Sequence, residues 1–522
     1  MMPGMNSLLP KLPLGISDFG YLREANVPYL YVDKTRLLPE LLNAGKYLFL
    51  TRPRRFGKSL ICSTLKYLYE GRRDLFQGLA IEPTWDWTQK YPVVFLSLAT
   101  LGNATPEKLT ANLTAWLRDQ AETYGVDLSG KDMPDCFVAF LAAVHAHTGR
   151  RVVVIVDEYE KPVHDHIENG ILAGQMRDVL ASFYGALKGC DAVVEKVFIT
   201  GVGRMVKTSI FSALNQMKDV TLHEAAAELC GYTEGELSRY FEPFVSALAQ
   251  RHALTFEQAR QTIRDRYNGY GWGKGERVYN PWAILNCLDD REFGSYWWES
   301  GTPSMLLKLA DNLERPDGDM EGLVLAEKDL LFDLADPRPE PLLWQAGYLT
   351  IRETDGAMYT LGFPNTEVRE AWFGLMLNRF RGKPGGARGH TTAAIMLNAL
   401  SKGDRPRFEQ ALAALFASIP GELHLGKEAF YHAVFIAALQ ATGGRLIPES
   451  RSDKGRADAV LETRDLIYLI EFKLGSAEEA LAQIKARRYY EPYLADPRKL
   501  VLLGAGGFAE KNIRCLWEDV TR

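Results

Sequence analysis

The sequence predicts an α/β fold with a mostly parallel sheet near the N-terminus, a mostly helical middle region and a second α/β unit at the C-terminus. Up to about residue 224, short apolar runs alternate with longer amphipathic stretches, which is typical of parallel strands joined by helices. The pattern then becomes largely helical as far as about residue 378. A Gly/Pro-rich stretch, 382–386, precedes the last unit. The expected domains are 1–230, 231–385 and 386–522.

The composition is that of a folded protein without a dominant charge. Of its 522 residues, 47% are hydrophobic and 24% are charged, with 61 Lys and Arg against 66 Asp and Glu. This balance excludes disordered and collagen-like classes, and it provides no field that attracts nucleic acid over long range. The apolar runs are far shorter than the ~18 residues that span a bilayer, and no signal-peptide pattern occurs. We therefore expect a cytoplasmic protein with no membrane partner. The six cysteines show no CxxC spacing, so neither a zinc site nor a disulfide framework is indicated.

Five short apolar runs of the first unit are expected to be the strands of its sheet. The runs are Tyr47–Leu50, Val93–Leu98, Val152–Val156, Val194–Thr200 and Val220–Leu222. In the middle region, residues 348–352 and 358–361 flank Asp355-Gly356, which predicts a β-hairpin. We expect this region to contain a helical lid followed by a small, winged-helix-like part.

The first expected strand leads into a phosphate-binding loop. Residues 51–59 read Thr-Arg-Pro-Arg-Arg-Phe-Gly-Lys-Ser, and a helical stretch follows. In such loops backbone N–H groups cradle the β-phosphate, the lysine, here Lys58, reaches the β- and γ-phosphate oxygens, and the serine, here Ser59, ligates Mg²⁺. The full signature has a glycine five residues before Gly57. This chain has Arg52 there, so the loop must turn without that glycine.

Two adjacent carboxylates, Asp157 and Glu158, end the third expected strand. Asp157 would hold the magnesium shell while Glu158 polarises the water that attacks the γ-phosphate, although a solvated acidic turn is the simpler interpretation. Thr200 ends the fourth strand, and Arg204 follows it. Both are candidates to sense the γ-phosphate, but a strand-ending turn explains them equally well. The expected nucleotide-binding residues are Arg55, Phe56, Gly57, Lys58, Ser59, Asp157 and Thr200.

Near the C-terminus, residues 455–461 and 466–474, joined by a tight turn at 462–465, predict a second hairpin. If Glu462 pairs with Asp465, then Asp458 faces Leu469, and Glu471 is the diagonal neighbour of Asp458 on the same face. Diagonal neighbours lie about 7 Å apart, close enough for two carboxylates to share one metal ion.

Lys473, two residues after Glu471, projects from that face as well. Two carboxylates that hold Mg²⁺ and an ammonium that orients or activates water are the minimal set for phosphodiester hydrolysis. An exposed hairpin face would show the same residues. The flanking residues are strongly apolar, however, and favour a buried strand, in which charges are costly unless they serve a metal or one another.

The stretch 477–490 after this hairpin is expected to be an amphipathic helix with basic residues on one face, either a contact for a phosphate backbone or a solvated surface. Its polar residues include Gln483, Lys485, Arg487, Arg488 and Tyr490. From residue 421 to the C-terminus, Lys and Arg equal Asp and Glu in number. Nucleic acid is therefore expected to bind through local contacts and not through long-range attraction.

These motifs resemble a known family. The segment from about 12 to 215, with Tyr31-Val32-Asp33-Lys34-Thr35, the loop 52–59 and Thr200-Gly201-Val202, is similar to the bacterial AAA-ATPase-like family, whose loop shares the arginine. The C-terminal segments 455–458, 470–473 and 480–484 look like the PD-(D/E)XK nuclease domain that commonly follows it.

The resemblance implies a P-loop NTPase-type domain and a restriction-endonuclease-like α/β domain. It implies that Asp458 and Glu471 are metal ligands and that Lys473 is the catalytic lysine. Glu428 and Gln483 match accessory positions of the nuclease, but the tyrosine usual four residues after the glutamine is Arg487 here.

The leading hypothesis is an ATPase that uses ATP and Mg²⁺ and whose nucleotide state controls a magnesium-dependent nuclease. Its partner would be nucleic acid, DNA in preference to RNA. AAA-type sites are often completed between subunits, so a homo-oligomer is a candidate assembly by analogy. The alternative is a nucleotide-gated switch or nucleic-acid-binding protein without cleavage activity. A GTP-dependent regulator is a third hypothesis, but no guanine-reading motif is evident.

Overall fold

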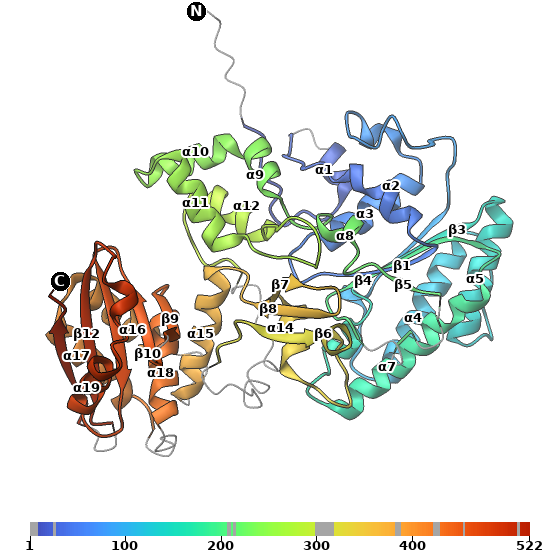
Figure 1. The fold of residues 1–522 in the computed structure, drawn as a ribbon. Coiled ribbons are helices and arrows are strands. Elements are labelled where there is room, and N and C mark those ends of the chain that lie inside the picture. The colour runs from blue at the N-terminus through green and yellow to red at the C-terminus, as the bar shows by residue number, and fades with distance from the viewer. Residues whose placement is uncertain are drawn as a thin grey trace, which may run out of the picture. The chain divides into compact units, whose positions relative to one another are not determined.

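The computed structural model describes residues 9–24, 28–205, 210–211, 214, 216–297, 318–381, 388–420, 428–452, 455–508 and 512–521. The chain divides into two compact units (Figure 1). The first consists of residues 1–305 and 322–365, and the second of residues 306–321 and 366–522. The Gly/Pro-rich stretch 382–386 lies outside the described residues. Within the described ranges, no helix has both the length and the apolar character needed to cross a membrane.

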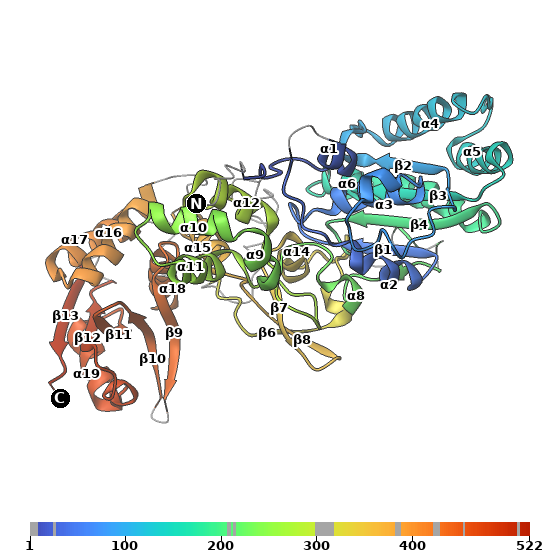
Figure 2. The same cartoon turned by 90° about the horizontal axis from the view of Figure 1, so that it is seen from above.

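A five-stranded parallel sheet forms the centre of the first unit and confirms the predicted α/β class. Its strands are β1 (Tyr47–Thr51), β2 (Val93–Ser97), β3 (Val152–Asp157), β4 (Val194–Gly201) and β5 (Lys218–Asp219). Their order is β2-β3-β4-β1-β5, and the first four strands lie side by side in Figure 2. All residues of β1 and β3 are buried, which explains their continuous apolar sequences. β4 therefore separates the strand that enters the phosphate loop from the strand that ends in carboxylates.

The fifth strand, Lys218–Asp219, directly precedes the predicted run Val220–Leu222. The carboxylate of Asp219 accepts the N–H of Thr221 at 2.9 Å, and this contact turns the chain after Asp219. Val220 is buried and donates its N–H to the carbonyl of Phe49 in β1. The start of the apolar run therefore belongs to the core at the end of the sheet and not to a longer strand.

Helices flank this sheet, and several begin at side-chain caps. Thr105, Asp132 and Asn169 each accept a backbone N–H of the first turn that follows, which satisfies a donor without an intrahelical partner. The helices are α1 (Phe19–Glu24), α2 (Leu38–Asn43), α3 (Lys58–Tyr69), α4 (Pro106–Glu122), α5 (Met133–Thr148), α6 (Lys161–His164), α7 (Gly170–Gly185) and α8 (Glu224–Ala227). Of these, α3 starts at the phosphate loop and packs on β2, β3 and β4.

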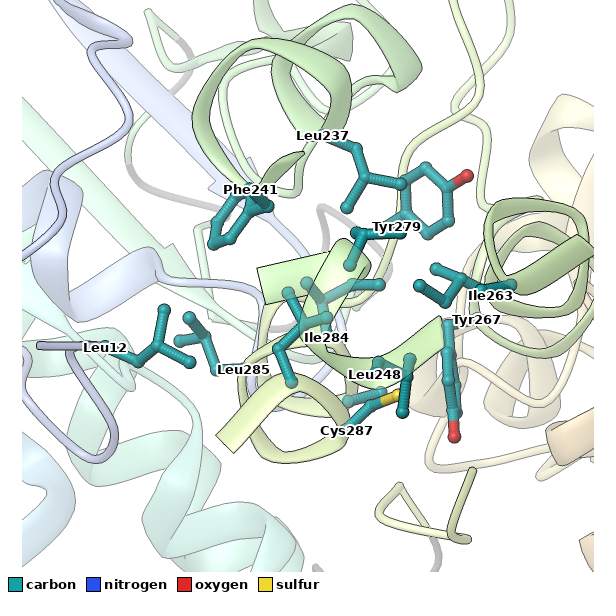
Figure 3. Packing of buried hydrophobic residues seen from close by; sticks show 14 of the residues in the cluster. Leu12, Leu237, Phe241, Leu248, Ile263, Tyr267, Tyr279, Ile284, Leu285 and Cys287 are labelled. Atoms are coloured by element: carbon teal, nitrogen blue, oxygen red, sulfur yellow. The ribbon is translucent and has the colours of Figure 1, made fainter. Parts of the chain in front are cut away.

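Four further helices form a body with its own core. They are α9 (Glu234–Tyr240), α10 (Glu242–Arg251), α11 (Phe256–Tyr267) and α12 (Pro281–Asp290). Capping boxes at Thr233 and Thr255 start α9 and α11. Figure 3 shows the buried side chains of these helices around Ile284, with Leu12 of the N-terminal segment beside Leu285 at the edge. The N-terminal segment is thereby held against the helical body.

A small antiparallel sheet completes the first unit. It contains β6 (Leu323–Ala326), β7 (Thr350–Thr354) and β8 (Met358–Gly362) in the order β6-β8-β7. The β7–β8 hairpin agrees with the prediction, whereas β6 was not predicted. The short helix α14 (Pro339–Ala346) precedes β7, and its residues from Pro341 to Gln345 are buried. These side chains of α14 therefore pack inside the unit.

The second unit is a mixed sheet with helices. The strands are β9 (Arg445–Ser452), β10 (Gly455–Glu462), β11 (Leu466–Phe472), β12 (Lys499–Gly506) and β13 (Arg514–Asp519), in the order β13-β12-β11-β10-β9. Only β11 and β12 pair in parallel, and α19 (Ala477–Arg487) connects them. The helix ends three residues before the predicted Tyr490, because Arg488 adopts a left-handed conformation (φ 53°). The other helices are α15 (Thr366–Phe380), α16 (Arg388–Lys402), α17 (Arg405–Ala417) and α18 (Glu428–Gln440).

The register of the β10–β11 hairpin differs from the prediction. Ala459 pairs with Ile470, so the next position places Asp458 directly opposite Glu471 and not opposite Leu469. The backbone N–H of Asp458 donates to the Glu471 carboxylate at 3.3 Å. The two carboxylates share one face, as predicted, but as direct neighbours rather than diagonal ones.

The chemistry of the turn explains this shift. The prediction paired Glu462 with Asp465, whereas Thr463 closes the turn with Leu466 in the structure. The Thr463 N–H donates to the Leu466 carbonyl at 2.8 Å, and the Thr463 hydroxyl accepts the Leu466 N–H at 3.0 Å. A threonine that bonds its neighbours in this way fixes the turn one residue later than the charge pattern suggested.

Candidate functional site

A cavity of about 610 Å³ lies in the first unit at the phosphate loop. One part of its wall is the loop and the start of α3, including Arg54, Gly57 and Lys58. Another part is apolar and comes from the N-terminal segment and the helical body. The apolar residues include Ile16, Leu30, Val32, Tyr232, Trp282 and Leu285. A cavity with cations on one wall and apolar or aromatic side chains on another has the chemical character that a nucleotide requires.

Two residues of the loop have a left-handed backbone conformation. Gly57, the N-cap of α3, has φ 87°, and Arg55 has φ 67°. The Arg55 guanidinium lies 4.2 Å from the centre of the Trp282 ring, and the buried Phe56 ring packs edge-on against Tyr270. These contacts fix the loop against the helical body, so its backbone N–H groups have a defined arrangement without the missing glycine.

Arg52, which replaces that glycine, is buried and points away from the cavity. Its guanidinium donates to the carbonyls of Thr51 at 2.7 Å, Thr221 at 2.9 Å and Ala226 at 2.6 Å. It also lies 4.1 Å from the centre of the Trp272 ring. Burial lowers the pKa of Arg52 to about 10, so the group stays charged at neutral pH. The arginine therefore supports the loop from the protein interior.

Lys58 and Ser59 both line the cavity at the start of α3. The Lys58 ammonium is almost fully buried and donates to the Pro53 carbonyl at 3.0 Å. Burial lowers the pKa of Lys58, while the nearby carboxylates of Asp157 and Glu160 act in the opposite direction. The ammonium thus lies between the loop and the carboxylates that follow β3.

The predicted carboxylates differ in their surroundings. Asp157, at the end of β3, is 4% exposed, and its carboxylate accepts the N–H of Glu158 at 3.0 Å. Glu158 has a left-handed backbone (φ 55°) and lines the cavity. Burial, and next the charge of Asp157, raise the pKa of Glu158. A carboxylate with a raised pKa beside a phosphate site is suited to accept a proton from water.

Thr200 and Arg204 do not reach the cavity. Thr200 is fully buried, and its hydroxyl donates to the carbonyl of Leu50 in β1 at 2.8 Å. The Arg204 guanidinium forms ion pairs with Asp219 at 2.6 Å and Glu327 at 2.9 Å. In this structure the first residue ties β4 to β1, and the second ties the end of β4 to β5 and to the segment after β6.

In the second unit, five polar side chains converge at the end of the β10–β11 hairpin. The Asp458 carboxylate accepts the N–H of Phe472 at 2.8 Å. The Glu471 carboxylate is 1% exposed, accepts a hydrogen bond from the side-chain amide of Gln483, and lies 3.5 Å from the ammonium of Lys473. The fifth side chain is Glu428 at the start of α18, whose carboxylate pairs with the Lys473 ammonium at 3.0 Å.

The electrostatics of this centre reflect its burial. Burial raises the pKa of Asp458, and burial together with Asp458 raises the pKa of Glu471 to about 7. Burial by itself would lower the pKa of Lys473, but the carboxylates of Glu428, Glu471 and Asp458 together raise it. A buried carboxylate beside a half-buried one is unfavourable unless a cation accompanies them.

The described residues contain no group of three or more His, Cys, Asp or Glu arranged to hold a metal ion. Asp458 and Glu471 offer two adjacent oxygen donors, the type of ligand that Mg²⁺ takes while it retains several waters. A divalent cation there would also offset the cost of burying both charges. The donor set therefore fits Mg²⁺.

Comparison with known proteins identifies the two parts of the chain that hold these residues. A family model described as "Predicted AAA-ATPase" matches residues 13–211, and one described as "PD-(D/E)XK nuclease superfamily" matches residues 426–517. A protein of Azotobacter chroococcum mcd 1, described as "Uncharacterized protein in vnfD 5'region", is 35% identical over 508 residues, which cover 95% of this chain and 96% of that protein. The chain belongs to the AAA-ATPase-like family. Its C-terminal part is a PD-(D/E)XK nuclease-superfamily domain, so both resemblances drawn from the sequence are confirmed.

The predicted basic face of α19 in this AAA-ATPase-like protein is largely neutralised by acidic neighbours. Lys485 pairs with Glu518 at 2.9 Å, and Arg488 pairs with Glu491 at 2.9 Å. Gln483 points instead at the carboxylate of Glu471. Only part of the expected basic surface is therefore available to a phosphate backbone.

The sequence did not indicate three polar residues that the structure places at these sites. His432 lies one helical turn after Glu428 on α18, and its ring hydrogen-bonds the carbonyl of Asp458 at 2.9 Å. Glu160 and His164 line the cavity at the phosphate loop. The four-residue spacing between Glu428 and His432 was the one available signal, because it puts both on one helix face.

Proposed function

We propose that the AAA-ATPase-like part binds and hydrolyses ATP in the cavity at the phosphate loop. The cavity wall supports this, because it combines the loop backbone, the ammonium of Lys58 and an apolar surface that suits a purine base. Mg²⁺ held by Ser59 and Asp157 would screen the phosphate charges. Glu158 would accept the proton of the attacking water, since a raised pKa makes its carboxylate a stronger base.

We further propose that the PD-(D/E)XK part cleaves phosphodiester bonds of nucleic acid, with DNA favoured over RNA, under control of the nucleotide state. The observation that carries this proposal is that Asp458, the buried Glu471 and Lys473 lie next to one another on the β10–β11 hairpin. Mg²⁺ held by the two carboxylates would polarise the scissile phosphate. Lys473 would orient the attacking water, and Gln483 would keep the Glu471 carboxylate in place.

A cleavage assay tests the proposal. Full-length protein is incubated with Mg²⁺ and labelled single- and double-stranded DNA and RNA, with and without ATP. Lys473→Ala should abolish cleavage, because it removes the ammonium beside Glu471. Lys485→Ala is the matched control, since it removes an exposed ammonium paired with Glu518 and should leave cleavage intact.

The outcomes separate the hypotheses. Cleavage that depends on Lys473 and changes with ATP supports a nucleotide-controlled nuclease. Cleavage by Lys473→Ala at the rate of the unmodified protein would refute the assigned role of that lysine. ATP hydrolysis with no cleavage of any substrate would refute the nuclease half and favour the alternative, a nucleotide-gated switch that binds nucleic acid without cutting it.

A further inference from the structure

Asp458 lies just beyond the regular pairing of the β10–β11 hairpin. The register of the two strands ends at the pair Ala459–Ile470. At the next position side chains make the contacts between the strands. The N–H of Asp458 donates to the Glu471 carboxylate at 3.3 Å, and the N–H of Phe472 donates to the Asp458 carboxylate at 2.8 Å. The place of this proposed metal ligand is therefore set by side-chain contacts and not by the regular strand pairing.

The backbone carbonyl of Asp458 is bound by a third element, the helix α18. Nε2 of His432 lies 2.9 Å from this oxygen. A carbonyl only accepts, so Nε2 carries the proton and donates. The imidazole is half-buried, and its centre lies 5.8 Å from that of the Phe472 ring. Phe435, three residues later on α18, lies 4.6 Å from the same ring. These aromatic contacts hold α18 against the end of β11 and keep the imidazole at the carbonyl.

The same helix also contacts the end of the other strand. Glu428, four residues before His432, pairs with the Lys473 ammonium at 3.0 Å, and its carboxylate accepts the N–H of Leu474 at 3.4 Å. Residues four apart lie on one face of a helix. α18 therefore contacts β10 through His432 and the chain after β11 through Glu428, so one rigid element holds both strands that carry the centre.

The affinity of a metal site depends on how firmly its ligands are held. Mg²⁺ requires near-ideal geometry, and loss of a group that orients a ligand typically costs about 10- to 100-fold in metal affinity. Gln483 supports Glu471 directly, because it donates to the carboxylate. His432 supports Asp458 through the backbone. A fixed carbonyl restricts rotation of the peptide plane, so the Asp458 carboxylate keeps its direction beside Glu471.

We propose that His432 is a positioning residue of the metal centre, which holds the Asp458 carbonyl so that the carboxylates of Asp458 and Glu471 can share one divalent cation. This inference rests on the proposed nuclease function and adds a residue to its site. The role needs a hydrogen-bond donor at the place of Nε2 and no bond between metal and imidazole. A residue that only stabilised the fold would change the thermal midpoint and leave the affinity for the cation unchanged.

Calorimetric titration of the full chain with Mn²⁺ tests this role. His432→Leu removes the donor, and we expect the Mn²⁺ affinity to fall about 10-fold. His432→Gln places an amide N–H close to where Nε2 lies, so it should keep most of the affinity. His147→Leu is the matched control, because it removes an exposed imidazole on α5 of the first unit and should leave the isotherm unchanged.

The thermal midpoint of each variant is measured without metal. His432→Asn is a second removal variant, because its shorter amide ends near the place of Nδ1 and does not reach the carbonyl. It keeps the test decisive if His432→Leu does not fold. Unchanged Mn²⁺ affinity in a folded His432→Leu or His432→Asn protein overturns the inference and leaves the proposed nuclease intact. An equal loss in His432→Gln overturns it too, because a donor alone then does not explain the role. An unmodified chain that binds no Mn²⁺ overturns the proposed metal centre itself.

Discussion

Replacement of Arg52 by glycine recreates the usual phosphate-loop signature, yet we expect it to destabilise this protein. The guanidinium donates three hydrogen bonds of 2.6 to 2.9 Å to the carbonyls of Thr51, Thr221 and Ala226, and it packs against the ring of Trp272. In Arg52→Gly those buried carbonyls lose a charged donor. The loop also gains backbone freedom in the unfolded state.

The size of the loss follows from these contacts. Hydrogen bonds to a charged group contribute about 1.5–3 kcal/mol each, and the ring contact contributes about 1 kcal/mol. The three carbonyls left without this donor cost about 1–3 kcal/mol each, and the saved cost of burying the guanidinium offsets part of that sum, so we expect a net loss of about 3–5 kcal/mol. Domains of about 150–250 residues lose about 2–4 °C per kcal/mol, and a larger unit loses less, so the thermal midpoint should fall by at most about 6–20 °C.

Differential scanning calorimetry of the full chain measures this midpoint, and the transition of the first unit can be assigned by its upward shift when ATP is added. Arg52→Met separates the two contributions, because it keeps the backbone of a non-glycine residue and removes all donors. We expect Arg52→Met to lose most of the stability that Arg52→Gly loses. If Arg52→Gly has the same thermal midpoint and the same ATP affinity as the unmodified protein, the buried arginine does not support the loop and the reasoning is wrong.

Three more variants test the two sites. Lys58→Ala removes the ammonium from the phosphates and should weaken ATP binding by about 10- to 100-fold, since a charged hydrogen bond contributes about 1.5–3 kcal/mol; calorimetric titration checks this, and unchanged affinity would exclude the loop as the phosphate site. Glu158→Gln should keep ATP affinity but slow hydrolysis by about 10²- to 10⁴-fold, because the proton acceptor is lost; normal turnover of ATP would exclude Glu158 from that role. Asp458→Ala removes one of two adjacent oxygen donors and should abolish a Mn²⁺ site seen by calorimetry in the unmodified protein, whereas an unaltered isotherm would refute its role as a ligand.

The elements that the sequence predicted well are those whose burial is continuous. β1 and β3 are buried at every residue, so their apolar runs were unambiguous. β6 was missed because it is only four residues long and none of its residues is fully buried. The hairpin register was wrong because one side chain, Thr463, decides where the turn closes. Such a local hydrogen bond cannot be predicted from the pattern of hydrophobic residues.

The same limit applies to the candidate sites. The sequence placed Thr200 and Arg204 near the nucleotide because the first ends a strand and the second follows it, but their contacts with β1, β5 and the segment after β6 decide where they point. Conversely, Glu160 belongs to no motif, and its place on the cavity wall depends on the chain path after β3. Asp458, Glu471 and Lys473 were easier to find, since neighbours along two strands keep their spacing in the fold.

The pairing of the α19 cations with Glu518 and Glu491 has a consequence for how this chain meets nucleic acid in a crowded cell. Encounter rates for charged partners rise when a surface presents unbalanced charge, and they fall steeply with salt. A helix whose Lys485 and C-terminal Arg488 are already matched by carboxylates gains less from such steering. If the proposed cleavage takes place, strands should therefore encounter this helix without strong electrostatic attraction, and the choice of substrate would depend on short-range contacts near Asp458.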